Sequence, residues 1–147
     1  METNNLEEFN VKFQVNTLSV YKSKYWTWSV RPTQVTLGSG VLSLNRYALH
    51  LSDLTEEEMA DLKNIVSKIE NTLKKTFGYD IMNYLMLMMV DHHVHYHVIP
   101  RYDGIKLFDG LEWVDNGWPA LPVMGDSQHK NREVILDKIR DELKNNL

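Results

Sequence analysis

Hydrophobic and polar residues alternate along residues 25–31, which read YWTWSVR. A period of two is typical of a half-buried strand, and Pro32 ends this one. Gly38 and Gly40 mark a turn, and the VLSL segment at residues 41–44 predicts a second strand. We expect the two strands to pair as an antiparallel hairpin, because they follow each other closely along the chain.

A helix is predicted to begin at Thr55, where residues 55–58 read TEEE. This sequence is typical of a capping box and places three acidic side chains at the positive end of the helix dipole. Gly78 is a candidate left-handed cap at the other end. Between these limits apolar residues recur at spacings of three and four, which predicts a stripe that lies on the sheet. The stripe consists of Met59, Leu62, Val66, Ile69 and Leu73.

Two further strands are predicted between residues 81 and 102. Residues 81–90 read IMNYLMLMMV, and a strand that is apolar on both faces is expected at the centre of its sheet. A tight turn at Asp91 and His92 leads into residues 93–102, HVHYHVIPRY, where histidines alternate with apolar residues. The second strand therefore has two unlike faces, and its histidine face requires polar surroundings.

The two ends of the chain carry patterns of their own. An alternation near the amino end predicts a short strand or an extended arm, and it consists of Phe9, Val11, Phe13 and Val15. Residues 103–126 contain four Gly and two Pro, and we expect a long ordered loop there rather than a regular element. Residues 127–147 predict a C-terminal helix with one apolar side, formed by Val134, Ile135, Ile139 and Leu143.

These elements predict an α+β fold. An antiparallel sheet of about five strands is expected to carry the helix that begins at Thr55 on one face and to expose the histidine row on the other. The length of 147 residues is that of one domain. We therefore expect a single domain over residues 1–147, with its core at about residues 25–103 and a covering loop and C-terminal helix over residues 104–147.

Composition narrows the classes of partner. The chain has 16 Lys and Arg against 20 Asp and Glu, and its net charge of −4 argues against a broad nucleic-acid interface. It contains no cysteine, which excludes disulfides, thiolate metal ligands and cysteine nucleophiles. The acidic start METNNLEEFN is unlike a targeting peptide, and the apolar run from Tyr84 to Val90 is too short to span a bilayer. We expect a cytoplasmic protein without a membrane partner.

Four of the six histidines fall between residues 92 and 97. Three of these, His93, His95 and His97, occupy alternate positions. On a strand, alternate side chains project from the same face with Cβ atoms about 6.6–6.8 Å apart. The three imidazoles are therefore expected to form a row on one side of the sheet.

Four interpretations of this row are open. The histidines are surface or structurally satisfied side chains, or they bind a metal ion, since neutral imidazole is a common metal ligand. The outer Cβ atoms of a flat strand lie about 13 Å apart, which makes it hard for three rings to reach one ion at about 2.0–2.1 Å. Alternatively the row binds an anion together with Arg101, or one imidazole attacks phosphorus while its neighbours supply hydrogen bonds and a proton.

Residues 93–99, HVHYHVI, resemble the motif of the histidine triad (HIT) superfamily of nucleotide hydrolases and transferases. The similarity continues into Pro100 and Arg101, into the DLTEEE start of the helix and into the upstream hairpin, so that it covers about residues 25–103. It implies a HIT-like fold, a homodimer and a two-step displacement without an obligatory metal or other cofactor. The implied substrates include dinucleoside polyphosphates and nucleoside phosphoramidates.

The resemblance also implies a role for each histidine of the motif. His95, in the middle, is the implied nucleophile, which forms a nucleotidyl-histidine intermediate on the α-phosphorus. His97 is implied to contact the phosphoryl and bridging oxygens and to help the leaving group depart. His93 is implied to support the geometry of the row rather than to react.

The sequence departs from the family pattern in the phosphate-binding loop. Family members commonly carry a glycine-rich loop that ends in Gly-Gln before the motif, whereas residues 85–90 read LMLMMV here. Phosphate contacts are then expected from backbone N–H groups, from residues 91–92 or from the long C-terminal loop. A further histidine of many members is replaced within residues 45–47, NRY, and no role is transferred to Tyr47 or His50.

Four residues outside the motif are candidates for substrate binding. Arg31 and Arg101 end strands that neighbour the site and could neutralise phosphate, or they have structural or solvated positions. Asn83 is a polar residue in an apolar strand and is a candidate to face the pocket. Trp28, two residues after Trp26, could frame a base, and core packing is its alternative.

We therefore expect a hydrolase or nucleotidyl transferase that acts on a small-molecule nucleotide through His95. The bond that it cleaves is expected to be a phosphoester, a phosphoanhydride or a phosphoramidate. A non-catalytic nucleotide-binding module and a metal-dependent enzyme that uses the histidine row are the alternatives.

Overall fold

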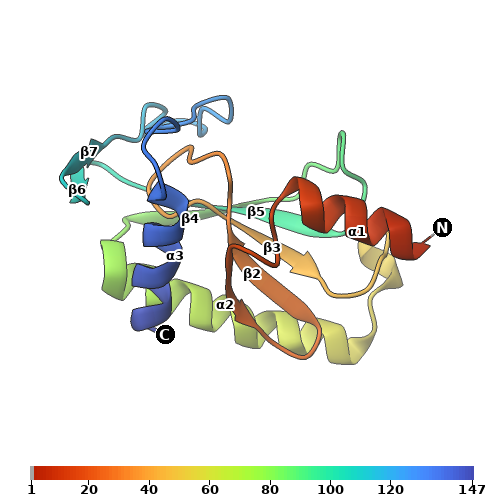
Figure 1. The fold of residues 1–147 in the computed structure, drawn as a ribbon. Helices are drawn as coiled ribbons and strands as arrows, with labels where there is room; N and C mark the ends of the chain where they lie inside the picture. The colour runs from red at the N-terminus through yellow and green to blue at the C-terminus, as the bar shows by residue number, and fades with distance from the viewer. Residues whose placement is uncertain (1) are drawn as a thin grey trace.

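The computed structural model describes residues 2–147. A five-stranded antiparallel sheet is formed by β1 (Ser19–Lys22), β2 (Trp26–Val30), β3 (Gly40–Leu44), β4 (Ile81–Leu85) and β5 (His95–Arg101) in the order β1-β2-β3-β5-β4. The helices are α1 (Glu2–Lys12), the 3-10 helix η1 (Leu51–Asp53), α2 (Glu56–Phe77) and α3 (Ile135–Asn145). Figure 1 shows α1 and α2 on opposite sides of the sheet. The predicted α+β class with about five antiparallel strands is confirmed.

The sheet has one apolar and one polar face. Its register places Trp28 beside Leu42 and Leu42 beside Tyr96, and this apolar face packs against α2 and α3 to form the main core. We call it the α2 face. The opposite face, which we call the α1 face, alternates with it along every strand. Polar side chains on the α1 face include Thr27, Ser29, Ser43, Asn83, His95, His97 and Arg101.

The predictions for the hairpin and for α2 are confirmed. Strands β2 and β3 pair antiparallel. At the start of α2 the Glu58 N–H donates to Thr55 Oγ1 at 3.1 Å, and the Thr55 N–H donates to Glu58 Oε1 at 2.8 Å, which completes the capping box. Gly78 ends the helix with φ +64°. The buried stripe differs from the predicted one, because Ile65 is buried whereas Met59 is 45% exposed.

The predicted central position of residues 81–90 is wrong. Strand β4 ends at Leu85, pairs only with β5 and lies at the edge of the sheet. The apolar residues after it belong to a loop over residues 86–94, where Met89 and Val90 are both 79% exposed. This loop replaces the predicted tight turn, so His93 lies just before β5 rather than inside it.

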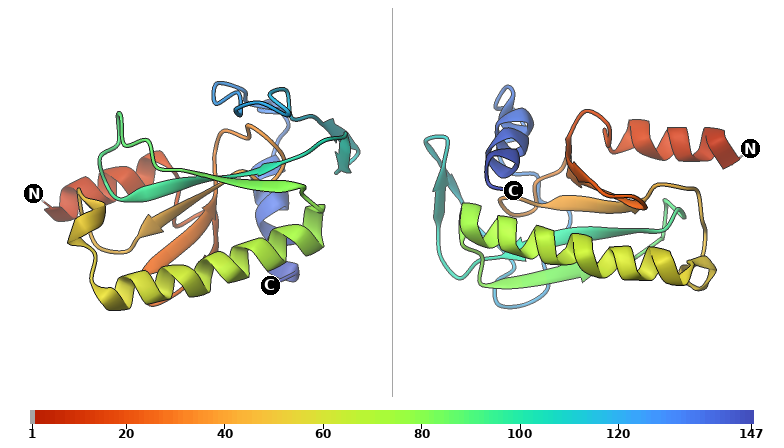
Figure 2. Two further views of the ribbon diagram at one scale, coloured as in Figure 1. Left: turned by 180° about the vertical axis from the view of Figure 1, so that it is seen from behind. Right: turned by 90° about the horizontal axis from the view of Figure 1, so that it is seen from below.

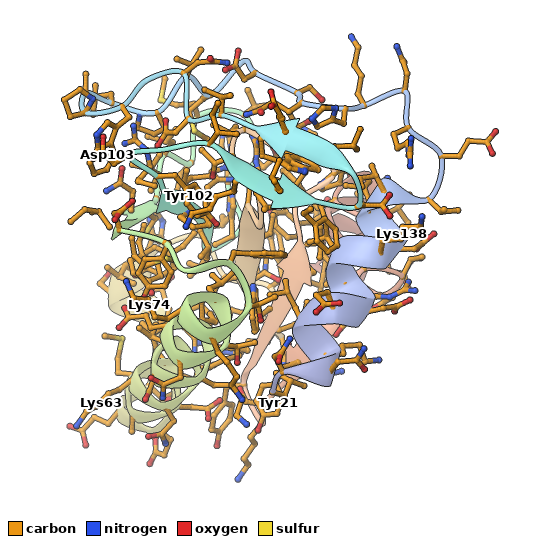
Figure 3. The ribbon with its side chains drawn as sticks, turned by 90° about the vertical axis from the view of Figure 1, so that its left-hand side faces the viewer. Tyr21, Lys63, Lys74, Tyr102, Asp103 and Lys138 are labelled. Carbon is orange, nitrogen blue, oxygen red and sulfur yellow. The ribbon has the colours of Figure 1, made fainter. Side chains whose placement is uncertain are left out.

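The segment after Pro100 contains regular structure that the sequence analysis missed. Strands β6 (Lys106–Phe108) and β7 (Leu111–Trp113) form a separate antiparallel hairpin. Its turn places Asp109 and Gly110 at φ 56° and 72°. An Asp-Gly pair is a strong hairpin signal because both turn residues adopt positive φ. Figure 3 shows this hairpin above α3, where Lys138 Nζ lies 3.1 Å from Asp109 Oδ1.

The predicted strand or arm near the amino end is also wrong, since residues 2–12 form helix α1. Phe9 and Phe13 stand one helical turn apart and point at the sheet, whereas Val11 between them is 77% exposed. Figure 2 shows α1 on the side of the sheet that α2 leaves uncovered. The α1 face is therefore covered, and the expectation of an exposed histidine row is wrong.

None of the helices within residues 2–147 is both long enough and apolar enough to cross a membrane.

Candidate active site

The three motif histidines lie together on the α1 face. His95 and His97 project from the same side of β5, and the centroids of their rings are 5.0 Å apart. The ring of His93 joins them from the loop before the strand, since Phe9 contacts both it and His95 at 4.9 and 5.0 Å. His93, His95 and His97 are only 2%, 2% and 7% exposed. The predicted row therefore exists, but it is a buried one.

The hydrogen bond of His95 leaves one of its ring nitrogens free to react. Its Nδ1 lies 2.6 Å from the carbonyl oxygen of His93, and because a carbonyl only accepts, Nδ1 must carry the proton. Nε2 then keeps its lone pair. Burial, the largest effect, lowers the pKa of His95 below its usual value near 6.5, which favours the neutral ring at pH 7. A neutral imidazole with a free Nε2 is suited to nucleophilic attack.

Both ring nitrogens of His93 are bound to the backbone. Its Nε2 lies 2.9 Å from the carbonyl oxygen of Leu44 and therefore donates, and its Nδ1 accepts the N–H of Ala48 at 3.3 Å. Tyr47 stacks on the same ring with centroids 5.4 Å apart. His93 thus ties the loop before β5 to the end of β3, and this loop supplies the carbonyl that orients His95.

His97 has a charged neighbour. Arg31, the first residue after β2, donates from Nε to His97 Nδ1 at 3.2 Å and from Nη1 to the carbonyl oxygen of Thr33 at 3.0 Å. Burial lowers the pKa of His97 most, and the charge of Arg31 lowers it further, to about 4. His97 is therefore neutral at physiological pH, with its single proton on Nε2.

Helix α1 forms the roof of the site, and the sequence analysis missed it. The Phe13 ring lies 5.8 Å from that of His95 and 6.1 Å from that of His97, next to the contacts of Phe9. Lys12 Nζ binds Asp91 Oδ2 at 2.8 Å and fastens the helix to the loop before β5. The signal in the sequence is the spacing of four between the two phenylalanines, which fits a helix as well as a strand.

A cavity of about 240 Å³ opens beside this roof. It lies between α1 and the loop before β5 and extends to His93. Ligand sites usually occupy about 300–1,000 Å³, so the cavity is smaller than most of them. It is lined by Asn5, Glu8, Phe9, Lys12, Tyr47, Val90, Asp91, His92 and His93.

Three of the four predicted substrate-binding residues lie away from the histidines. Trp28 is fully buried on the α2 face, so the suggestion that it frames a base at the histidine row is wrong. Arg101 lies on the α1 face but binds Asp115 through two nitrogens, at 2.6 and 3.1 Å. Its Nη1 donates to Asn83 at 2.8 Å, and its Nη2 also donates to Ala120. Arg101 and Asn83 thus hold the 115–120 segment, and only Arg31 contacts the triad.

No group of three or more His, Cys, Asp or Glu side chains in the described part of the chain is placed to hold a metal ion. The hydrogen bonds explain this for the motif itself, because both nitrogens of His93 and Nδ1 of His97 are already engaged. The metal-dependent alternative therefore has no set of three such ligands among the side chains of residues 5–147.

Comparison with known proteins agrees with this fold. A family model described as the HIT domain matches residues 41–104, which include most of β3 and all of α2, β4 and β5. Bis(5'-nucleosyl)-tetraphosphatase (asymmetrical) from Schizosaccharomyces pombe is 30% identical over 132 residues, which are 83% of this chain and 72% of that protein. The chain belongs to the histidine triad family.

Solved structures share the same arrangement of strands and helices. A histidine triad protein from Sinorhizobium meliloti 1021 has a TM-score of 0.67 at 18% identity, over 91% of this chain and 93% of its own. A histidine triad protein from Bradyrhizobium japonicum has a TM-score of 0.66 at 22% identity, over 90% and 93% of the two chains. At these identities the likeness establishes the fold alone.

Proposed function

We propose that the protein is a nucleotide hydrolase or nucleotidyl transferase in which His95 is the nucleophile. The observation that carries the proposal is the 2.6 Å hydrogen bond between His95 Nδ1 and the carbonyl oxygen of His93. This bond fixes the proton on Nδ1 and leaves Nε2 unprotonated. When the ring becomes positively charged in a nucleotidyl adduct, Nδ1–H still donates its hydrogen bond to this carbonyl, and this charge-assisted bond stabilises the intermediate.

The reaction would proceed by two displacements. First, His95 Nε2 forms a bond to phosphorus, the bond from phosphorus to the leaving group breaks, and the electron pair departs with that group. Then water or another acceptor attacks phosphorus, the bond to Nε2 breaks, the electron pair returns to His95, and the proton of the attacking group is released to solvent. His97 would donate a hydrogen bond from Nε2 to the substrate oxygens, and His93 would hold the carbonyl that orients His95.

Arg31 is the proposed phosphate-binding cation of this site. The sequence lacks the Gly-Gln loop that commonly serves this purpose in the family, and residues 86–90 offer only apolar side chains. Arg31 is half-buried, and no carboxylate forms an ion pair with it among the side chains of residues 5–147. A guanidinium without a charged partner beside the nucleophile is suited to bind a substrate phosphate.

The family and one relative support the substrate class. The chain is 30% identical to a protein from Schizosaccharomyces pombe that is named for dinucleoside tetraphosphate hydrolysis. We propose a dinucleoside polyphosphate or a related nucleoside phosphoester, phosphoanhydride or phosphoramidate as substrate. It would enter between α1 and the 86–94 loop, where the present cavity reaches His93, the first histidine of the motif.

Trapping the adduct tests this proposal. The wild-type protein is incubated briefly with a dinucleoside tetraphosphate that is labelled at the α-phosphorus, then denatured and analysed for acid-labile label on His95. Wild type should incorporate label and release nucleoside monophosphate, and His95→Ala should do neither. Turnover by His95→Ala at the wild-type rate would contradict the assignment of the nucleophile.

The non-catalytic alternative has one observation in its favour, namely that Phe9 and Phe13 cover the histidines. A binding module would take up a nucleotide without cleaving it. Calorimetry with AMP and a cleavage assay over a panel of dinucleoside polyphosphates and phosphoramidates separate the two. Binding of AMP without cleavage of any substrate would favour the module.

We also propose that the protein is a homodimer. Strand β4 is an edge strand with its outer backbone groups unpaired in the sheet, and Ile81 at its start is 52% exposed. Exposed apolar residues continue beyond it at Leu87 and Met89. An edge of this kind favours association with a second chain. Light scattering after size-exclusion chromatography should give twice the mass of 17.2 kDa.

A further inference from the structure

The contact between Arg31 and His97 decides where the His97 proton is. The Nε–H of Arg31 donates to His97 Nδ1 at 3.2 Å, while its Nη1 is held by the Thr33 carbonyl oxygen at 3.0 Å. A guanidinium is always protonated in a protein and only donates. The Nδ1 of His97 must therefore be an acceptor without a proton of its own, and the one proton of the neutral ring is on Nε2.

A histidine in this state donates a hydrogen bond but not a proton. Transfer of the Nε2 proton from a neutral ring would leave an imidazolate anion, which is not formed near neutral pH. To act as an acid, His97 would first need a second proton at Nδ1, where the Arg31 N–H already points. The resulting cation would also face the guanidinium at hydrogen-bond distance.

We propose that Arg31 is a positioning residue that keeps His97 a hydrogen-bond donor and so selects phosphoanhydride substrates over phosphoramidates. In an anhydride the bond between phosphorus and the bridging oxygen breaks, and the electron pair stays on that oxygen. The departing phosphate is stable as an anion and needs only the hydrogen bond from His97 Nε2. In a phosphoramidate the pair stays on nitrogen, which departs as an amine only when it receives a proton.

The other groups around His97 are consistent with a neutral ring. Arg31 faces it from the end of β2, His95 from the same strand and Asp91 from the loop before β5. Burial and the charges of Arg31 and His95 lower the pKa of His97 to about 4, and Asp91 opposes them. Lys12 on α1 binds that carboxylate at 2.8 Å, and α1 otherwise places the Phe13 ring against His97.

The inference rests on the proposed function, and matched substrates test it. At pH 6, kcat is measured for a dinucleoside tetraphosphate and for an adenosine 5'-phosphoramidate. Wild type should prefer the anhydride, and Arg31→Met should narrow that preference by about 100-fold, which is the low end of what general-acid catalysis contributes. Its phosphoramidate activity should rise more steeply than that of wild type as the pH falls, because loss of the Arg31 charge raises the pKa of His97, which burial still holds below its usual value.

Nitrogen NMR of the histidine rings gives a readout that does not depend on activity. In the wild type His97, assigned by its absence in His97→Asn, should show a protonated Nε2 and a bare Nδ1 down to pH 5. In Arg31→Met it should become protonated at Nδ1 at a higher pH than in the wild type, because the Arg31 charge is gone while burial remains. Arg132→Met removes an exposed arginine outside the site and should change neither the substrate preference nor the spectrum. Thermal unfolding checks that each variant is folded.

The outcomes separate this inference from the proposed function. If wild type cleaves the anhydride and the phosphoramidate equally well, selection by Arg31 is wrong while the hydrolase proposal stands. An unchanged preference or an unchanged His97 spectrum in Arg31→Met would also overturn it. If wild type cleaves neither substrate, the proposed function is wrong. The proposal that Arg31 selects substrates is then wrong as well, even if the NMR spectrum shows the expected tautomer of His97.

Discussion

The two faces of the sheet are built on different principles. The α2 face is a continuous apolar core in which Trp26, Trp28 and Ile69 are fully buried. The α1 face carries the histidines and is covered by a small separate cluster in which Phe9 and Phe13 supply the aromatic rings. The packing on the α2 face is part of the main core, so this face opens only when the whole protein unfolds. The α1 cover rests on two rings and one exposed ion pair, so we expect it to open far more readily.

The largest expected effect belongs to the α2 face. Ile69 is fully buried beneath the sheet, and Ile69→Ala removes three carbons from the packed core. We expect the free energy of unfolding to fall by about 2–5 kcal/mol, measured by urea denaturation. Turnover per folded molecule should stay as in wild type, because the histidines are on the other face.

Met59→Ala is the matched control for this change. Met59 lies on the same helix but is 45% exposed, and its truncation should cost less than about 0.5 kcal/mol. Equal losses for the two variants would show that the α2 face is not the stable half of the molecule.

The second prediction concerns the cover of the α1 face. The double variant Phe9→Ala, Phe13→Ala loses the burial of two side chains at about 1.5 kcal/mol or more each, which raises the open population about 100-fold. The rate at which diethyl pyrocarbonate modifies His95, read by peptide mass spectrometry, should rise by that factor.

Val11→Ala is the control for the cover, since Val11 stands between the two phenylalanines but is 77% exposed. It should leave the modification rate unchanged. A His95 that is modified equally fast in wild type and in the double variant would mean that α1 does not shield the triad in solution.

The α2 face, with its large apolar core, is easier to predict from the sequence than the α1 face, with its small aromatic cover. The α2 face repeats its signals many times, with a helix of 22 residues that has both caps and with strands that alternate cleanly. The α1 cover offers one informative pair, Phe9 and Phe13, whose spacing fits an alternation with Val11 and Val15 as well as a helical turn. Four residues are too few to distinguish the period of a strand from that of a helix. The predicted strand or arm at this end of the chain is therefore wrong.

The sequence predicts the row of histidine side chains, but it does not predict which residues contact the arginines near them. Alternation alone placed His95 and His97 on one side of a strand, because that is a property of the backbone. The partners of Arg31 and Arg101 depend on which strands are neighbours and on where the long C-terminal segment returns. Two arginines that look alike in the sequence therefore differ, one at His97 and the other in a buried pair with Asp115.

The third prediction uses the different pH windows of the two faces. The pKa of His97 is about 4 in the folded protein, mainly through burial, against about 6.5 in an unfolded chain. Between these two pH values the unfolded chain binds more protons than the folded protein. The contribution of His97 to the free energy of unfolding is therefore complete above pH 6.5 and is lost as the pH falls toward 4. This titration contributes a slope of at most about 1.4 kcal/mol per pH unit.

Urea denaturation between pH 5 and pH 7.5 measures that slope, which His97→Asn should reduce. At the start of α2, the hydrogen bond from Arg46 lowers the pKa of Glu58 most. A carboxylate of this kind contributes stability that is lost only below its usual pKa near 4.5, outside this window. Identical slopes for wild type and His97→Asn would contradict the buried, neutral state of His97.

The smallest expected effect tests the ion pair that fastens the cover. Lys12 Nζ lies 2.8 Å from Asp91 Oδ2, but Lys12 is half exposed, so the pair contributes only about 0.2–1 kcal/mol and is weakened by salt. Lys12→Met should speed modification of His95 by about 1.5- to 5-fold at low ionic strength, and this difference should vanish in 1 M salt. Lys63→Met, on the exposed side of α2 (Figure 3), is the control and should have no effect. A salt-independent acceleration in Lys12→Met would instead assign the contribution of Lys12 to the packing of its aliphatic stem on Phe13.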